Sequence, residues 1–163
     1  MRTSRVFLGV GAAVVVTSLL VHSSRPIFAQ GNPFLGTWVL NITKSKYTPG
    51  PPPKDQTVVN EVAGQGMKTT AKGADAAGKP TTTVFTATFD GKDFPVTGNP
   101  DYDTQSYKRV DANTFELTRK KAGKVVQTGT NVVSKDGKTR TVTVTGMDAQ
   151  GRKINNVSVY EKK

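Results

Sequence analysis

The sequence predicts an all-β fold, an antiparallel up-and-down meander barrel of about eight to ten strands. From residue 55 onward, turn signals containing Gly or Asn recur at nearly even intervals, and the segments between them are rich in Thr, Val and aromatic residues. Several of these segments alternate apolar and polar residues, as strands with one buried face do. After residue 30, no segment shows the apolar spacing of an amphipathic helix over three turns. Closure of the meander into a barrel is expected because it leaves no unpaired strand edge.

The first 29 residues are predicted to be a signal peptide. Arg2 and Arg5 precede an apolar run over residues 6–21, and Ala29 ends a cleavage site. The run is shorter than the roughly 20 residues that span a bilayer. We therefore expect an exported protein, periplasmic or extracellular, with a single domain over residues 30–163 and no membrane span after cleavage. An uncleaved anchor is the alternative.

The composition of residues 30–163 excludes several classes of function. This part carries 20 of the 23 basic residues and all 12 acidic ones, a net charge of +8. There is no Cys, so no disulfide stabilises the exported domain, and the one His, His22, lies in the signal segment. We predict a protein that is not an enzyme and has no cofactor, although chemistry by carboxylates or tyrosines stays open.

Residues 34–41 are predicted to form the first strand. They contain Trp38, the one tryptophan of the chain. Residues 49–53 hold four prolines, which fix φ and lack an N–H, so this part is predicted to be an extended loop leading to the second strand.

Alternation assigns inward faces to three later segments. Phe85, Ala87 and Phe89 share one face of residues 83–89. Phe115 and Leu117 share a face of the next clear strand.

Val142 and Val144 share one face of residues 141–145. Residues 125–134 alternate poorly, so their inward face is ambiguous. Residues 91–112 contain Pro95 and Pro100 and are interpreted as a short strand plus a loop.

The charged residues suggest two further kinds of site. Gly is followed by Lys or Arg in five turns, which either forms basic rims that meet an anionic envelope polymer or is ordinary hairpin chemistry. No nucleic-acid partner is expected, because aromatic residues do not interleave with the basic ones. Four acidic residues offer oxygens for Ca²⁺ but match no complete loop spacing, so no metal site is predicted. They are Asp90, Asp93, Asp101 and Asp103.

The sequence resembles the calycins, which comprise the lipocalins and the intracellular fatty-acid-binding proteins. Gly36-Thr37-Trp38 resembles their Gly-x-Trp signature, and residues 159–162 are similar to the last strand of the fatty-acid-binding branch. The resemblance implies that Gly36 and Trp38 form the closed base of the barrel. It also places the two arginines that anchor a fatty-acid carboxylate at Ser158 and near Val132, where this chain has no Arg.

A longer resemblance is to small secreted bacterial proteins. These share Phe34-Leu35-Gly36-Thr37-Trp38, the run over residues 44–46 and the segment over residues 90–100. This likeness implies no particular activity.

Together these observations predict an exported, monomeric, lipocalin-like barrel that binds a small, mostly apolar molecule. The alternative is a solid basic barrel that acts through its surface as an envelope-associated interaction module. The candidate lumen residues, chosen by alternation and by the last-strand resemblance, are Phe85, Phe89, Phe115, Leu117, Ser158 and Tyr160.

Overall fold

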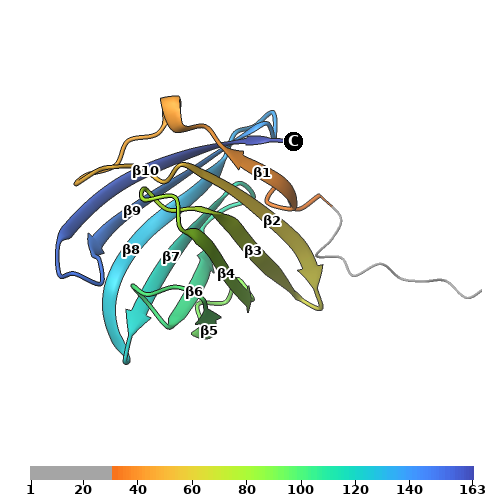
Figure 1. The fold of residues 1–163 in the computed structure, drawn as a ribbon. Helices are drawn as coiled ribbons and strands as arrows, with labels where there is room; N and C mark the ends of the chain where they lie inside the picture. The colour runs from red at the N-terminus through yellow and green to blue at the C-terminus, as the bar shows by residue number, and fades with distance from the viewer. Residues whose placement is uncertain (1–30) are drawn as a thin grey trace, which may run out of the picture.

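The computed structural model describes residues 31–163, which form one closed barrel of ten antiparallel strands. Each strand pairs with the next in sequence, and the last strand returns to pair with the first (Figure 1). The predicted all-β meander barrel is confirmed. The strands are β1 (Gly36–Leu40), β2 (Asp55–Ala63), β3 (Gly66–Ala74), β4 (Pro80–Ala87), β5 (Phe94–Thr97), β6 (Thr104–Arg109), β7 (Thr114–Lys121), β8 (Lys124–Val133), β9 (Thr139–Met147) and β10 (Lys153–Lys162). The predicted signal peptide, residues 1–29, lies outside the described residues.

The turn signals read from the sequence lie at the connections between strands, and two of them include the first residue of the following strand. For example, Gly123 lies between β7 and β8, and Gly137 lies between β8 and β9. Both have positive φ, 76° and 70°, a conformation that glycine adopts without steric cost. The positions of the glycines therefore predicted the hairpins, because these tight turns need a residue with positive φ.

Residues 91–112 differ from the prediction, because they contain two strands rather than one. β5 is followed by a loop over residues 98–103 and then by β6, which pairs with β7 along its whole length. The inward positions of β6 include Gln105 and Tyr107, both buried. Apolar alternation missed β6 because a polar amide takes one of its inward positions.

The poorly alternating segment over residues 125–134 belongs to β8. Amide side chains take inward positions in this strand too. Gln127, Asn131 and Val133 are buried, whereas Val132 between them is exposed. Hydrophobicity alone could not assign this face because amides occupy inward positions.

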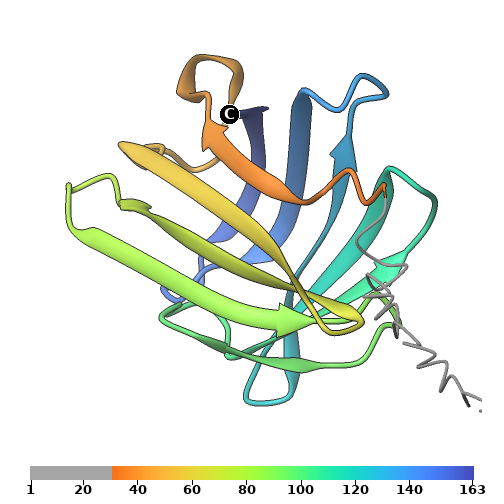
Figure 2. The ribbon, with the colours of Figure 1, turned by 90° about the vertical axis from the view of Figure 1, so that its right-hand side faces the viewer.

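The connection between β1 and β2 passes beside β10. A short 3-10 helix, η2 (Ile42–Lys44), follows β1, and Lys46 then bridges to Val157 of β10. The chain continues through residues 49–54 without helix or strand before β2 begins. Figure 2 shows this connection beside the C-terminal strand.

The two ends of the barrel are filled differently. At one end, which we call the packed end, the β2–β3, β4–β5, β6–β7 and β8–β9 connections meet the residues that precede β1. Aromatic rings fill its interior, with Phe34 and Phe115 centred 4.7 Å apart and Phe115 and Tyr107 centred 4.2 Å apart. At the opposite end, the cavity end, the interior holds a pocket. Within residues 31–163, no helix has the length and hydropathy needed to cross a bilayer.

Candidate functional site

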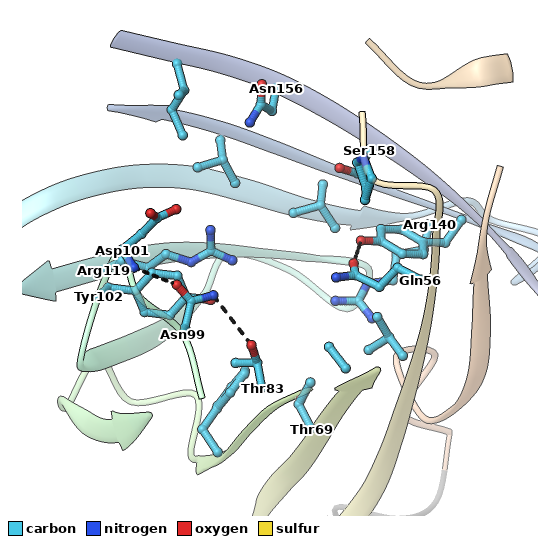
Figure 3. A pocket seen from close by; sticks show the side chains of 18 of the residues that line it. Gln56, Thr69, Thr83, Asn99, Asp101, Tyr102, Arg119, Arg140, Asn156 and Ser158 are labelled. Carbon is cyan, nitrogen blue, oxygen red and sulfur yellow. Dashed lines mark hydrogen bonds between the residues drawn. The ribbon is translucent and has the colours of Figure 1, made fainter. Parts of the chain in front are cut away.

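The cavity end of the barrel encloses a pocket of about 220 Å³ (Figure 3). Its walls come from most of the strands and from the loops at this end. Apolar residues, including Val58, Phe85, Val142 and Val144, cover part of the wall. The rest is polar, with four tyrosines, two arginines and several amides and hydroxyls. The lumen is thus more polar than the mostly apolar ligand predicted from the sequence would require.

Arg140 is the most unusual residue in this wall. It lies on β9 with 5% of its surface exposed, and its Nε donates a 3.0 Å hydrogen bond to Asn131 Oδ1 of β8. Its Nη1 is buried and has no hydrogen-bond partner. Burial lowers the pKa of the guanidinium, and the neighbouring Tyr107 and Tyr160 oppose that effect. An arginine nevertheless keeps its proton in a protein, so a positive charge sits inside the barrel.

Arg119 of β7 supplies a second positive charge to the pocket. Its Nε donates to Gln105 Oε1 at 2.6 Å, and its Nη1 donates to Gln127 Oε1 at 2.9 Å. The guanidinium lies 4.4 Å from the centre of the Tyr102 ring, a cation–π distance. Amides and an aromatic face therefore hold Arg119, while its charge is left without a carboxylate in direct contact. In Figure 3, Arg119 and Arg140 approach the pocket from different sides.

One carboxylate, Asp101, lies at the mouth of the pocket. Its Oδ1 accepts a 2.9 Å hydrogen bond from the Ala149 backbone N–H, and its Oδ2 accepts a 3.5 Å bond from Gln127 Nε2. The first bond ties the β5–β6 loop to the β9–β10 turn, and the second ties it to β8. Asp101 thus shapes the mouth, and it neutralises neither arginine by direct contact.

Tyrosines form much of the remaining wall. The hydroxyl of Tyr160 donates to Gln56 Oε1 at 2.5 Å, and the hydroxyls of Tyr47 and Ser158 share a 2.8 Å hydrogen bond. Burial raises the pKa of Tyr160 to about 12 and that of Tyr107 also to about 12. Both phenols therefore stay neutral near pH 7 and present aromatic faces and hydroxyls to the pocket.

The structure divides the six candidate lumen residues into two groups. Phe85, Ser158 and Tyr160 line the pocket. Phe89, Phe115 and Leu117 do not; they belong to the core, and Phe89 and Phe115 pack edge to face with ring centres 5.2 Å apart. Alternation gave the inward direction of these side chains but not their height along the barrel axis. At the packed end, inward side chains fill the space that a ligand would need.

Gly36 and Trp38 lie outside the pocket wall. Trp38 is fully buried, and the Lys162 ammonium lies 5.1 Å from its ring centre. Gly36 has φ of +107°, and a Cβ there would meet the Lys162 side chain at 3.2 Å. The surroundings of both residues are those of packing at the start of β1.

Sequence reasoning missed the two pocket arginines, although the pattern contained them. Arg140 is two residues before Val142, and Arg119 is two residues after Leu117, so each shares the inward face already assigned. Apolar alternation did not reveal them, because each arginine lies at the next inward position beyond the apolar residues of its strand. Carrying the period of two one step further would have placed both charges inside the barrel.

The two arginine positions implied by the calycin resemblance also differ from those observed. Ser158 lines the pocket as a hydroxyl bonded to Tyr47, and Val132 points outward on β8. The cations enter the lumen from β7 and β9, at Arg119 and Arg140.

A second hollow of about 310 Å³ lies outside the first, beneath the proline-rich loop. Tyr47, Pro53 and Asp101 line both spaces, so the outer hollow is a vestibule to the pocket. In the described part of the chain, no group of three metal-ligating side chains comes together.

The sequence matches no protein-family model and no curated protein. Among solved structures, zebrafish ileal bile acid-binding protein complexed with cholic acid is similar, with 14% sequence identity and a TM-score of 0.49. The match covers 80% of this chain and 99% of that chain. The barrel described above rests on its own strand pairing, and the resemblance to small secreted bacterial proteins stays a prediction.

Proposed function

We propose that this barrel binds one small organic molecule inside its lumen, at the cavity end. The observation that carries the proposal is the pocket itself, which is bounded below by the packed aromatic core and opens above into the vestibule. A concave site with apolar walls and a few converging polar groups is the usual form of a small-molecule site.

The pocket favours a compact ligand. Its volume, about 220 Å³, is below the roughly 300–1,000 Å³ of sites for drug-sized molecules. A long lipid chain would not fit in the pocket as it stands, because the packed end is already filled by Phe34, Phe89 and Phe115.

The alternative function, a solid barrel acting through its basic surface, requires a lumen filled by side chains. The pocket favours lumen binding over that alternative. The net charge of +8 is compatible with attraction to anionic polymers, and such attraction would be salt-sensitive.

We also propose that the protein is exported and works in the periplasm or outside the cell. The support is the pattern of residues 1–29, in which Arg2 and Arg5 precede an apolar run and a small-residue cleavage site. Fractionation of cells expressing the full chain with a C-terminal tag tests this. Recovery of a shortened protein outside the cytoplasm is the expected result, and a full-length cytoplasmic product contradicts it.

Filling the pocket tests lumen binding. Ala71 lies on β3 in the pocket wall, so Ala71→Trp places an indole in the ligand's space. Val132→Trp is the matched control, because Val132 points outward. We expect compounds that raise the melting temperature of the wild type to have no effect on Ala71→Trp and an unchanged effect on Val132→Trp. Equal stabilisation of both variants would place the binding site elsewhere.

A further inference from the structure

We propose that the lumen ligand is a compact organic carboxylate whose negative charge is held by Arg140, with Arg119 as the second cation of the site. This inference rests on the proposed function, since it names the chemical class that the same pocket takes. It is carried by Arg140, whose charge the protein buries and leaves without a counter-ion.

The first step of the argument is the missing partner of Arg140. The residue is 5% exposed, yet its guanidinium makes one hydrogen bond, to the neutral amide of Asn131. Among residues 31–163, the ion pairs join other residues, and Nη1 of Arg140 has no hydrogen-bond partner. A charge removed from water costs free energy unless an opposite charge compensates it. The protein does not supply that charge, and a bound anion would.

The second step is the electrostatic balance of the wall. Its charged residues are Arg119, Arg140 and Asp101, which gives an excess of one positive charge. Asp101 lies at the mouth and accepts hydrogen bonds from Ala149 and Gln127. Arg119 and Arg140 repel each other enough for Arg119 to contribute to the lowered pKa of Arg140. An anion between them relieves this repulsion.

The third step concerns the remainder of the ligand. Val142, Val144 and Phe85 form an apolar wall, and Tyr102, Tyr107 and Tyr160 add ring surface. An inorganic anion would leave these surfaces in contact with water, whereas a small carbon skeleton covers them. The planar fork of an arginine matches the geometry of a carboxylate. Charge, walls and volume together indicate a carboxylate on a small ring or short chain.

The class is tested with pairs of compounds that differ in charge but hardly in shape. Benzoate with benzamide, cinnamate with cinnamamide, and hexanoate with hexanamide are titrated into the purified barrel by calorimetry and thermal shift. We expect at least one carboxylate to bind and to exceed its amide by roughly tenfold or more in affinity, the difference expected for a charge-assisted contact. Inorganic phosphate serves as the probe for an anion without a carbon skeleton and is expected to bind more weakly than that carboxylate.

The residue is tested by Arg140→Met, with Arg140→Lys as the variant that keeps the charge but loses the fork. Arg109→Met is the matched control, because Arg109 stacks on Phe89 at 4.2 Å in the packed end and does not line the pocket. Arg140→Met is expected to lose the preference for carboxylate over amide, and Arg140→Lys to keep part of it. Arg109→Met is expected to keep all of it.

The outcomes separate this inference from the proposed function. If amides bind as tightly as their carboxylates, the lumen binds small molecules but the carboxylate assignment is wrong. Tighter binding of phosphate than of every carboxylate would also overturn it. If no carboxylate binds, the carboxylate assignment is wrong, and if compounds stabilise Ala71→Trp as much as the wild type, both proposals fail. If Arg140→Met does not fold, Arg140→Lys and the compound pairs still test the carboxylate assignment.

Discussion

The indole Nε1 of Trp38 donates a 2.9 Å hydrogen bond to the carbonyl oxygen of Phe34, four residues earlier in the chain. Asn60 Nδ2 donates to the same oxygen at 2.8 Å. The segment entering β1 is thereby fixed to β2 at the packed end. Because Trp38 is fully buried, Trp38→Ala should lower the free energy of unfolding by about 3–5 kcal/mol, as truncation of a core aromatic does.

Urea unfolding followed by circular dichroism measures this change. Val39→Ala is the control, because Val39 is the next residue and its side chain is 37% exposed on the outside of the barrel. We expect that control to change the free energy of unfolding by about 0.5 kcal/mol or less. Equal effects of the two substitutions would show that Trp38 does not support the packed end.

The buried pair of Asn60 and Thr69 offers a test of polar packing. Thr69 Oγ1 donates to Asn60 Oδ1 at 2.9 Å, and both residues are buried. Asn60→Ala leaves the Thr69 hydroxyl without this acceptor, so we expect a loss of about 1–3 kcal/mol. The double variant Asn60→Ala, Thr69→Val should cost less than the sum of the single variants, because the orphaned hydroxyl is gone. A double-mutant cycle by denaturant unfolding measures the coupling, and strict additivity would contradict it.

Two buried tyrosines predict a loss of stability at alkaline pH. The pKa of Tyr107 and that of Tyr160 are each raised from 10.0 to about 12, chiefly by burial. The folded state therefore holds these protons more tightly than the unfolded state. Their contribution is fully present below about pH 10 and is lost as the pH rises from about 10 through 12, by roughly 2–3 kcal/mol per tyrosine.

Chemical denaturation at a series of pH values measures this loss, and phenolate absorbance reports the ionisation itself. Tyr160→Phe should reduce the alkaline decline in stability by about half relative to wild type. A stability that stays constant up to pH 12 would mean that neither phenol is buried as described.

Gly129 predicts a steric limit in the middle of the barrel wall. A Cβ on Gly129 would collide with the carbonyl oxygen of Thr143 on the neighbouring β9. Gly129→Ala must therefore push β8 from β9, and we expect a loss of about 1–3 kcal/mol or more. Gly137→Ala is the comparison, because a Cβ there meets nothing within 4 Å and the cost comes from its φ of +70° alone. Melting temperatures of the two variants rank these costs, and a greater loss in Gly137→Ala would contradict the steric account.

The fold was accessible from the sequence because its determinants are local. Turns need Gly, as at Gly123 and Gly137, and half-buried strands need alternation, as in the segment with Phe85 and Ala87. β6 was missed because its inward positions include Gln105, which carries no hydrophobic signal.

The candidate site was only partly accessible because its residues meet through closure of the barrel. Gln56 and Tyr160 are hydrogen-bonded across 104 positions of the sequence. Period-two patterning indicates that a side chain points inward but not whether it lies in the packed end or in the cavity. Arg140 shows the further difficulty: its period-two position predicts an inward side chain, but the sequence does not show that its charge is buried without a carboxylate partner.

Closure of the ring by β10 makes the whole pocket depend on the one strand that follows all the others in sequence. β1 pairs on one side with β2, and on the other with the last residues of the protein, where Trp38 lies opposite Lys162 and Leu40 opposite Tyr160. Without β10, the hairpins up to β8–β9 can all form, but β1 and β9 each keep an unpaired edge. The barrel wall and the wall of the pocket are completed by β10 (Lys153–Lys162). A chain truncated before residue 153 therefore lacks one wall of the pocket and has no finished binding site.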